Sequence, residues 1–170
     1  ANLFGIGGAS LLSRSLGEKN YQKARQATTF GFYAALAVAL CGSLAVLFFK
    51  ESFLNLLGAT GGPREFTGNY LFWVFIIGGA PTLLGMVLAH FVRADGAPRQ
   101  ASLGLSMGGV LNMVLDPLFI FPWGFGLGVT GAAIATLIAN LATLVYFFNY
   151  FYRKRKTTTI SLNPRNLILH

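Results

Sequence analysis

The feature that most constrains the fold is a set of long segments without a charged side chain. No Asp, Glu, Lys or Arg occurs over 26–49 or 66–92, and 101–152 contains only Asp116. The last segment is interrupted by the Pro-, Trp- and Gly-rich sequence FPWGFGLG, so it divides into two. Each resulting segment reaches the roughly 20 residues that a helix needs to cross about 30 Å of hydrocarbon. These segments predict an all-α integral membrane protein, a polytopic helical bundle.

One partial and four complete membrane spans are expected. The complete spans are about 26–49, 66–92, 101–121 and 129–152. Residues 1–13 resemble the end of a helix whose first part is missing, and the first Met is Met86, so we expect a fragment of a longer chain. Residues 1–152 then form one helical unit, and the basic segment 153–170 is expected to be a cytoplasmic linker.

The basic residues are expected to lie mostly on one side of the membrane. The chain has 13 Lys and Arg against 5 Asp and Glu, and connections between successive spans alternate sides. All the basic residues except Lys50 and Arg64 then share a side: Arg14, Lys19, Lys23, Arg25, Arg93, Arg99, Arg153, Lys154, Arg155, Lys156 and Arg165. An excess of Lys and Arg marks the cytoplasmic side. The net charge of +8 therefore indicates orientation and contact with the lipid bilayer, and we expect no nucleic-acid partner.

Motifs of enzymes and cofactor sites are missing from the sequence. It has no His, Cys and Glu cluster at metal-binding spacing, no Gly-x-Ser-x-Gly and no phosphate-binding Gly-Lys-Ser/Thr. Asp116 is the only carboxylate inside an expected span, whereas an intramembrane aspartyl enzyme needs two. The single Cys41 excludes a disulfide framework. We therefore expect neither an enzyme nor a bound cofactor.

Asp116 requires an explanation, because an isolated ionised carboxylate in a low-dielectric setting is costly. It lies roughly 8 Å below the outer end of its span, and Asn112 lies one turn deeper on the same face. Thr136 and Asn140 stand at matching depths on the next span. We expect these four side chains to converge on a small cation, H⁺ or Na⁺. The alternatives are structural: Asp116–Pro117 acts as a helix N-cap, and the Asn and Thr side chains only hold helices together.

Two prolines and one turn complete the candidate residues. Pro117 and Pro81 each remove a helical hydrogen bond and are expected to kink their spans. The sequence RADG contains Asp95–Gly96, a strong turn signal, and is expected in a cytoplasmic loop. The alternative to a simple turn is a gating contact between Arg93 and Asp95.

Several longer motifs occur in a specific order: FVRADGAPRQA, LNMVLDPLFIF and GLGVTGAAIATLIAN, preceded near the start by GIGGASLLSRSLGEKNYQKA. Together they resemble the multidrug and toxic compound extrusion (MATE) family of secondary transporters, over essentially the whole chain. The resemblance implies a fold of twelve helices in two lobes. This chain then supplies helices two to six of the first lobe, and 153–170 links the lobes. Helix one and the second lobe are the missing partners.

The resemblance also implies a cation site and a function. The family site uses an Asp on helix one, an Asn and an Asp four apart on helix five, and a Thr on helix six. Asn112 and Asp116 match the helix-five pair and Thr136 matches the Thr, while the helix-one Asp has no counterpart here. The implied function is a cation-coupled (H⁺ or Na⁺) antiporter of the inner (cytoplasmic) membrane that exports drugs and other small cationic or amphipathic xenobiotics. A lipid-linked precursor flippase and a non-transporting membrane scaffold or truncation product are the alternatives.

Overall fold

The computed structural model describes residues 2–58, 61–155 and 157–167, and none of these residues lies in a β-strand. The helices are α1 (Asn2–Gly17), α2 (Tyr21–Phe48), α3 (Lys50–Leu56), α4 (Gly62–Leu71), the π-helix η1 (Phe72–Ile77), α5 (Gly79–Ala94), α6 (Pro98–Ile120), α7 (Gly128–Lys154) and the 3₁₀-helix η2 (Pro164–Leu167). The prediction of an all-α bundle is confirmed.

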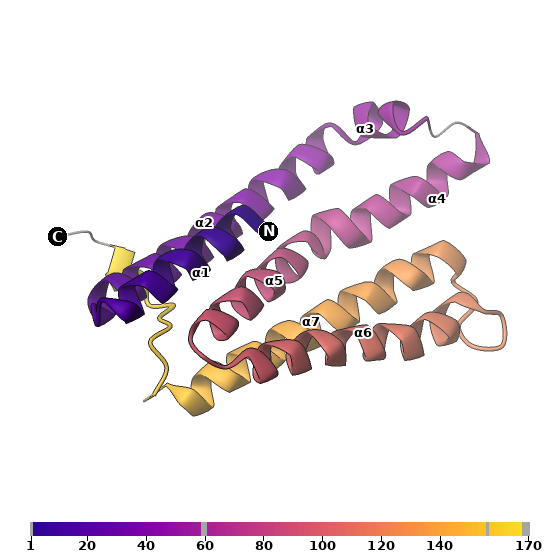
Figure 1. The fold of residues 1–170 in the computed structure, drawn as a ribbon. Helices are drawn as coiled ribbons and strands as arrows, with labels where there is room; N and C mark the ends of the chain where they lie inside the picture. Colours follow the sequence, from indigo (N-terminus) through magenta and orange to yellow (C-terminus); the bar gives the residue numbers. More distant parts are fainter. Residues whose placement is uncertain (1, 59–60, 156, 168–170) are drawn as a thin grey trace.

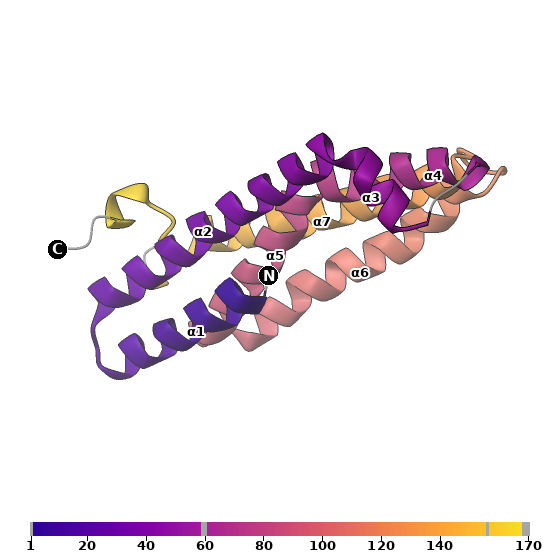
Figure 2. The same cartoon turned by 90° about the horizontal axis from the view of Figure 1, so that it is seen from above.

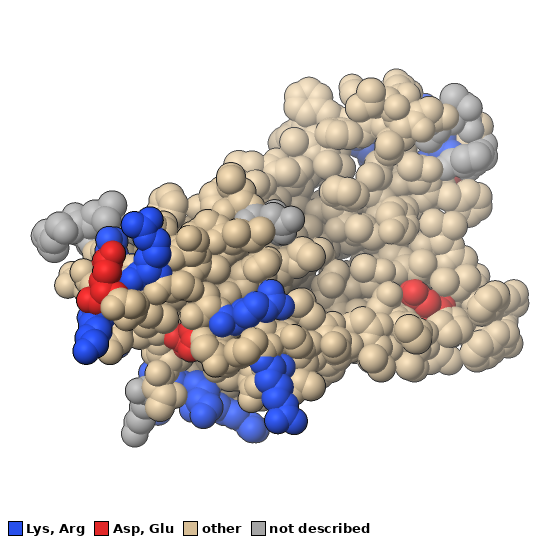
Figure 3. All heavy atoms as spheres, viewed as in Figure 1, with Lys and Arg blue, Asp and Glu red and all other residues tan. Residues whose placement is uncertain are grey.

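The long helices lie side by side as three antiparallel layers (Figures 1 and 2): the α1–α2 hairpin, the bent α4–η1–α5 segment, and the α6–α7 hairpin. Helix α5 lies in the middle and packs against α1, α2, α6 and α7. The α1–α2 turn, the α5–α6 turn and the end of α7 share one end of the bundle, where Lys and Arg gather in Figure 3. We call this the basic end. The opposite end holds α3 and the α6–α7 loop.

Within the residues that the structure describes, three helices are long and apolar enough to cross a membrane: α2, α6 and α7. A fourth span results if the segments Arg64–Ile77 and Gly79–Ala94, which meet at 47°, are counted together. Helix α3, which lies in the connection between α2 and α4, is not predicted by the sequence pattern. Leu54 of α3 is buried together with Val46 of α2 and Leu71 of α4, so the amphipathic α3 covers the opposite end of the α2–α4 pair.

The apolar core lies toward the basic end of the bundle. Leu12, Leu88, Phe91 and Phe147 are fully buried there and belong to one cluster contributed by α1, α5 and α7 together with residues of α2 and α6. Close approach of α6 and α7 depends on Gly104, because a Cβ atom at that position would lie 2.7 Å from Cζ of Phe147. Small residues allow this kind of close helix contact within membranes.

The two prolines differ in their effect on the helices. The fourth span breaks at Gly78, three residues before Pro81, because Pro81 has no N–H to donate to the carbonyl of Ile77. Helix α6 instead runs as one helix from Pro98 to Ile120 with Pro117 inside it. The expected kink therefore lies at Gly78, on the N-terminal side of Pro81.

Candidate functional site

The loop between α6 and α7 fixes how these two helices face each other. The backbone N–H groups of Phe125 and Leu127 donate to the carbonyls of Leu118 and Phe119, both at 2.9 Å, so the last carbonyls of α6 are paired. Gly131 of α7 packs so closely against the carbonyl oxygen of Phe119 that no larger side chain fits. The loop thereby sets the register of the two helices around their inward-facing polar residues.

Three of the predicted site residues meet at this contact. The side-chain amide Nδ2 of Asn112 lies 3.1 Å from Oδ1 of Asp116 and 3.3 Å from Oγ1 of Thr136. The hydroxyl of Thr136 donates to the carbonyl of Ala132 at 2.9 Å, which leaves its lone pairs facing Asn112. All three side chains are half-buried. We call Asn112, Asp116 and Thr136 the α6–α7 polar cluster.

The charge of Asp116 has no cationic partner within the described part of the chain. The ion pairs there join Lys23 to Glu18 and Arg64 to Glu51. The α6–α7 polar cluster offers a carboxylate, an amide oxygen and a hydroxyl oxygen. Hard cations prefer such oxygen ligands, and a carboxylate also accepts a proton. The described residues contain no group of three or more His, Cys, Asp or Glu that would hold a transition metal.

The capping alternative for Asp116–Pro117 is wrong. These residues lie in the last two turns of α6, whereas an N-cap stands at the first turn of a helix. The partner that α6 itself offers Asp116 is the side-chain amide of Asn112, which is neutral.

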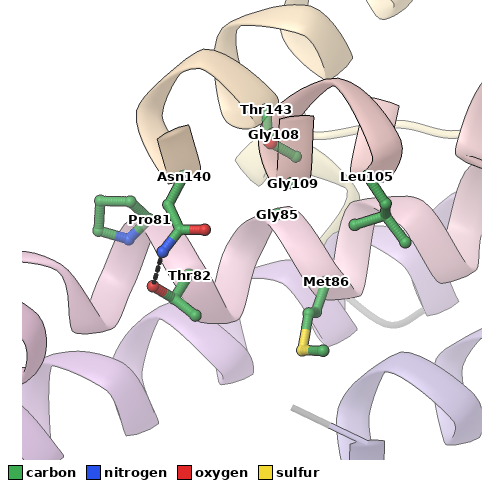
Figure 4. A pocket seen from close by; sticks show the side chains of 9 residues that line it. All are labelled: Pro81, Thr82, Gly85, Met86, Leu105, Gly108, Gly109, Asn140 and Thr143. Carbon is green, nitrogen blue, oxygen red and sulfur yellow. Dashed lines mark hydrogen bonds between the residues drawn. The ribbon is translucent and has the colours of Figure 1, made fainter. Parts of the chain in front are cut away.

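Asn140, the fourth predicted residue, takes a different partner. Its Nδ2 donates to Oγ1 of Thr82 on α5 at 2.7 Å (Figure 4). Asn140 lies one turn from Thr136 on α7, further from the opposite end, and lines a cavity of about 140 Å³ between α5, α6 and α7. Gly85 and Gly108 are among the other residues that line this cavity. The structure thus joins Asn140 to α5 and not to the α6–α7 polar cluster.

Asp95 forms the expected turn at the end of α5. Gly96 has φ of 90°, and the N–H of Ala97 donates to the carbonyl of Val92 at 3.1 Å, a typical helix C-terminal motif. The alternative contact between Arg93 and Asp95 is not among the ion pairs of the described residues. Arg93 is exposed instead.

Sequence reasoning missed the partners of Asp95. Its Oδ2 accepts from the hydroxyl of Thr158 at 2.6 Å, and its Oδ1 accepts from the backbone N–H of Thr159 at 3.3 Å and from the hydroxyl of the same residue. The signal in the sequence for these partners was the run of threonines at 157–159, directly after the basic residues that end α7.

The segment that follows these threonines also packs on α2. The hydroxyl of Thr29 donates to the carbonyl of Ser161 at 2.8 Å, and the hydroxyl of Tyr33 donates to that of Leu162 at 3.2 Å. Ile160 is 8% exposed and belongs to the main core. We call residues 157–163 the docked segment. This part of the expected 153–170 linker is therefore built into the bundle.

Comparison with known proteins finds a matching family and similar bacterial proteins. A sequence model of the MatE family matches residues 1–118. The multidrug export protein MepA of Staphylococcus saprophyticus is 40% identical over 163 residues, which is 95% of this chain and 35% of that protein. MepA of Staphylococcus aureus strain NCTC 8325 is 37% identical over 162 residues, with the same coverage.

A solved structure shares the fold. It is described as the inward-facing conformation of a multidrug resistance MATE family transporter of the MOP superfamily, and it superposes with a TM-score of 0.89 at 25% identity. The match covers 98% of this chain and 37% of the solved one. The chain thus spans about a third of the length of the curated relatives, 35% in each case given above. It is a multi-pass membrane chain, and it belongs to the MatE family.

Proposed function

We propose that the protein containing this chain is a cation-coupled antiporter that exports drugs across the cytoplasmic membrane, with H⁺ or Na⁺ as the coupling ion. The names of the MepA relatives and of the MATE structures support drug export. The observation that carries the coupling proposal is the α6–α7 polar cluster, in which Asp116 lies beside Asn112 without a cationic partner among the described residues. Intramembrane carboxylates in this situation are typically functional.

The coupling step follows from the cost of the charge. An empty, ionised Asp116 is disfavoured where the dielectric constant is low, so the site gains by taking up a proton or Na⁺ from outside. Uptake of the cation weakens the hydrogen bond that the Asn112 amide donates to Asp116, because it neutralises the charge of the accepting carboxylate. Asp116 also stands directly before Pro117, where α6 lacks one backbone hydrogen bond and bends at lower cost.

The substrate class follows from the same carboxylate. A small organic cation and the coupling ion both favour an anionic Asp116, so binding of one opposes binding of the other. This competition is the thermodynamic basis of exchange between two ligands. We therefore propose small, cationic or amphipathic substrates. The remaining lobe and the helix that precedes α1 complete the translocation path in this proposal.

The test uses the complete protein in inverted membrane vesicles with an imposed H⁺ or Na⁺ gradient. Asp116→Asn keeps the shape of the side chain and removes its charge, so we expect normal expression and loss of gradient-driven drug transport. Glu65→Gln is the matched control, since Glu65 is an exposed carboxylate on α4. Undiminished transport by Asp116→Asn would overturn the proposal and favour a structural role for this carboxylate.

A further inference from the structure

The break in the fourth span is a built feature of the fold. In the π-helix η1 the N–H of Gly78 reaches back five residues to the carbonyl of Trp73, at 2.9 Å. A Cβ atom on residue 78 would lie 2.8 Å from the carbonyl oxygen of Val74 and 2.9 Å from that of Trp73. Only glycine therefore fits at the break without a shift of the backbone. Such π-turns are frequent at functional positions in helices.

Two side-chain hydroxyl groups donate hydrogen bonds to backbone carbonyls around the break. The Thr82 hydroxyl donates to the carbonyl of Gly78 at 2.7 Å, alongside the Thr82 N–H at 3.0 Å. From the other side, the Ser43 hydroxyl of α2 donates to the carbonyl of Phe75 at 2.9 Å. Inside a membrane a broken helix persists only when its freed backbone groups find such partners. Thr82 and Ser43 thus brace the bend from opposite sides.

Asn140 connects this brace to α7. Its Nδ2 lies 2.7 Å from the same Thr82 hydroxyl that donates to Gly78, so a continuous path of two hydrogen bonds runs from Asn140 to the break. Figure 4 shows the amide nitrogen of Asn140 directed at Thr82 and its oxygen directed away from it, beside Gly85. On α7, Asn140 lies one turn from Thr136 of the α6–α7 polar cluster. One rigid helix therefore carries both a member of that cluster and the residue that holds the bend.

The side chain of Asn140 borders a cavity between α5, α6 and α7. About 140 Å³ of space borders the amide, and the small residues Gly85 and Gly108 line part of it. A rotation of Asn140 into this space would break its hydrogen bond to the Thr82 hydroxyl. Space for such a rotation is what a contact that switches requires.

We propose that Asn140 is a positioning residue that transmits the state of the α6–α7 polar cluster to the bend at Gly78 through Thr82, and that it is not a cation ligand. This inference rests on the proposed function, because it assumes that a cation binds at Asp116. Uptake of the cation shifts α7 against α6, the Asn140–Thr82 bond changes with it, and the bend between α4 and α5 responds. The coupling ion and the outer half of the fourth span are then linked without direct contact.

The experiment measures the bend directly in the complete protein. Spin labels at Phe66 on α4 and Arg93 on α5, both exposed, report the end-to-end distance of the bent span in a cysteine-free background. Labelled protein in lipid nanodiscs is titrated with NaCl at fixed pH, and separately with acid at fixed Na⁺. We expect a cation-dependent shift in the distance distribution of the unmodified span. Asn140→Leu and Thr82→Val should lose that shift, and Thr82→Ser, which retains the hydroxyl, should keep it.

Two further variants distinguish a failure of this inference from a failure of the proposed cation site. Thr130→Val removes a hydroxyl from the first turn of α7, away from the break, and should leave the shift intact. Asp116→Asn should abolish the shift by removing the cation site. Loss of the shift in Asp116→Asn with a full shift in both Asn140→Leu and Thr82→Val would overturn this inference alone. A full shift in Asp116→Asn would overturn the proposed cation site. Because Thr82→Val and Asn140→Leu act on different helices, misfolding of one leaves the other as the test.

Discussion

Asn112 and Asp116 stand one turn apart on α6, and the amide nitrogen of Asn112 lies 3.1 Å from Oδ1 of Asp116 and 3.3 Å from the hydroxyl of Thr136. One amide therefore joins the carboxylate of α6 to the hydroxyl of α7. The carboxylate is the only member of this group that carries a charge, so the members contribute unequally to cation binding.

This inequality predicts graded effects of substitution in the complete protein. Asn112→Ala and Thr136→Ala each remove one neutral ligand, which contributes about 1 kcal/mol. The cation concentration for half-maximal efflux should rise about fivefold in each, since 1.4 kcal/mol corresponds to a factor of ten. Asp116→Asn should instead abolish coupling. Gradient-driven efflux in vesicles measures both, with Thr130→Ala as the control. Complete loss of coupling in Thr136→Ala would contradict this ranking.

The bend at Gly78 should tolerate no side chain. Gly78→Ala places a methyl group 2.8 Å from a backbone oxygen, and the backbone has to shift to accept it. Overpacking of this kind typically costs about 1–3 kcal/mol. We expect a clear fall in the thermal unfolding temperature of the purified protein. Gly42→Ala on α2 is the control, since a Cβ there meets nothing within 4 Å. Equal stability of the two variants would show that the bend is not fixed by Gly78.

The sequence predicted the α6–α7 polar cluster because its geometry is local. Residues four apart stack on a helix face, which places Asn112 beside Asp116, and a short connection makes the next helix antiparallel, which brings Thr136 to the same depth. Asn140 follows the same spacing, yet its partner Thr82 comes from α5. Only the packing of a third helix determines that contact, and no periodicity in the sequence reports it.

The docked segment was not predictable for a related reason. Its contacts join residues far apart in the sequence, 132 positions in the bond between Thr29 and Ser161 and 63 in the bond between Asp95 and Thr158, and it has no helical or alternating pattern. The displacement of the kink from Pro81 was predictable in principle. Proline removes the bond to the residue four positions earlier, so the sequence IIGGAP locates the weak point at Ile77 and Gly78.

The docked segment should depend on Asp95. Hydrogen bonds to an ionised carboxylate are stronger than neutral ones, and Asp95 accepts three from Thr158 and Thr159. In Asp95→Ala, a cysteine placed at the buried Ile160 should react with a membrane-permeant thiol reagent about tenfold faster, the change expected for about 1.4 kcal/mol. Glu18→Ala, at an exposed ion pair, is the control. An unchanged rate in Asp95→Ala would show that the core contacts of Ile160 suffice.

The charge distribution predicts the orientation in the membrane. In intact cells an impermeant thiol reagent should label a cysteine at Gly126, in the exposed α6–α7 loop, and should not label one at the exposed Ser102 near the basic end. Permeabilised cells provide the control, because both positions should then react. Labelling of Ser102→Cys in intact cells would place the basic end outside and reverse the topology.

Contact between α6 and α7 should be sensitive to a single methyl group at Gly108. A Cβ atom there would overlap the hydroxyl of the buried Thr143 and approach the carbonyl of Ala139 to 3.3 Å. Gly108→Ala should therefore push α6 away from α7 and separate Asn112, one turn further along α6, from Thr136. We expect a lower unfolding temperature and weaker coupling. Gly109→Ala is the matched control for stability, because a Cβ on this adjacent residue meets nothing within 4 Å.

Thr143→Ala in the Gly108→Ala background removes the overlapping hydroxyl and should recover part of the loss. If the double variant is less stable than Gly108→Ala alone, the hydroxyl overlap is not the cause, and the hydrogen bonds that Thr143 makes to Ala139 and Gly104 matter more.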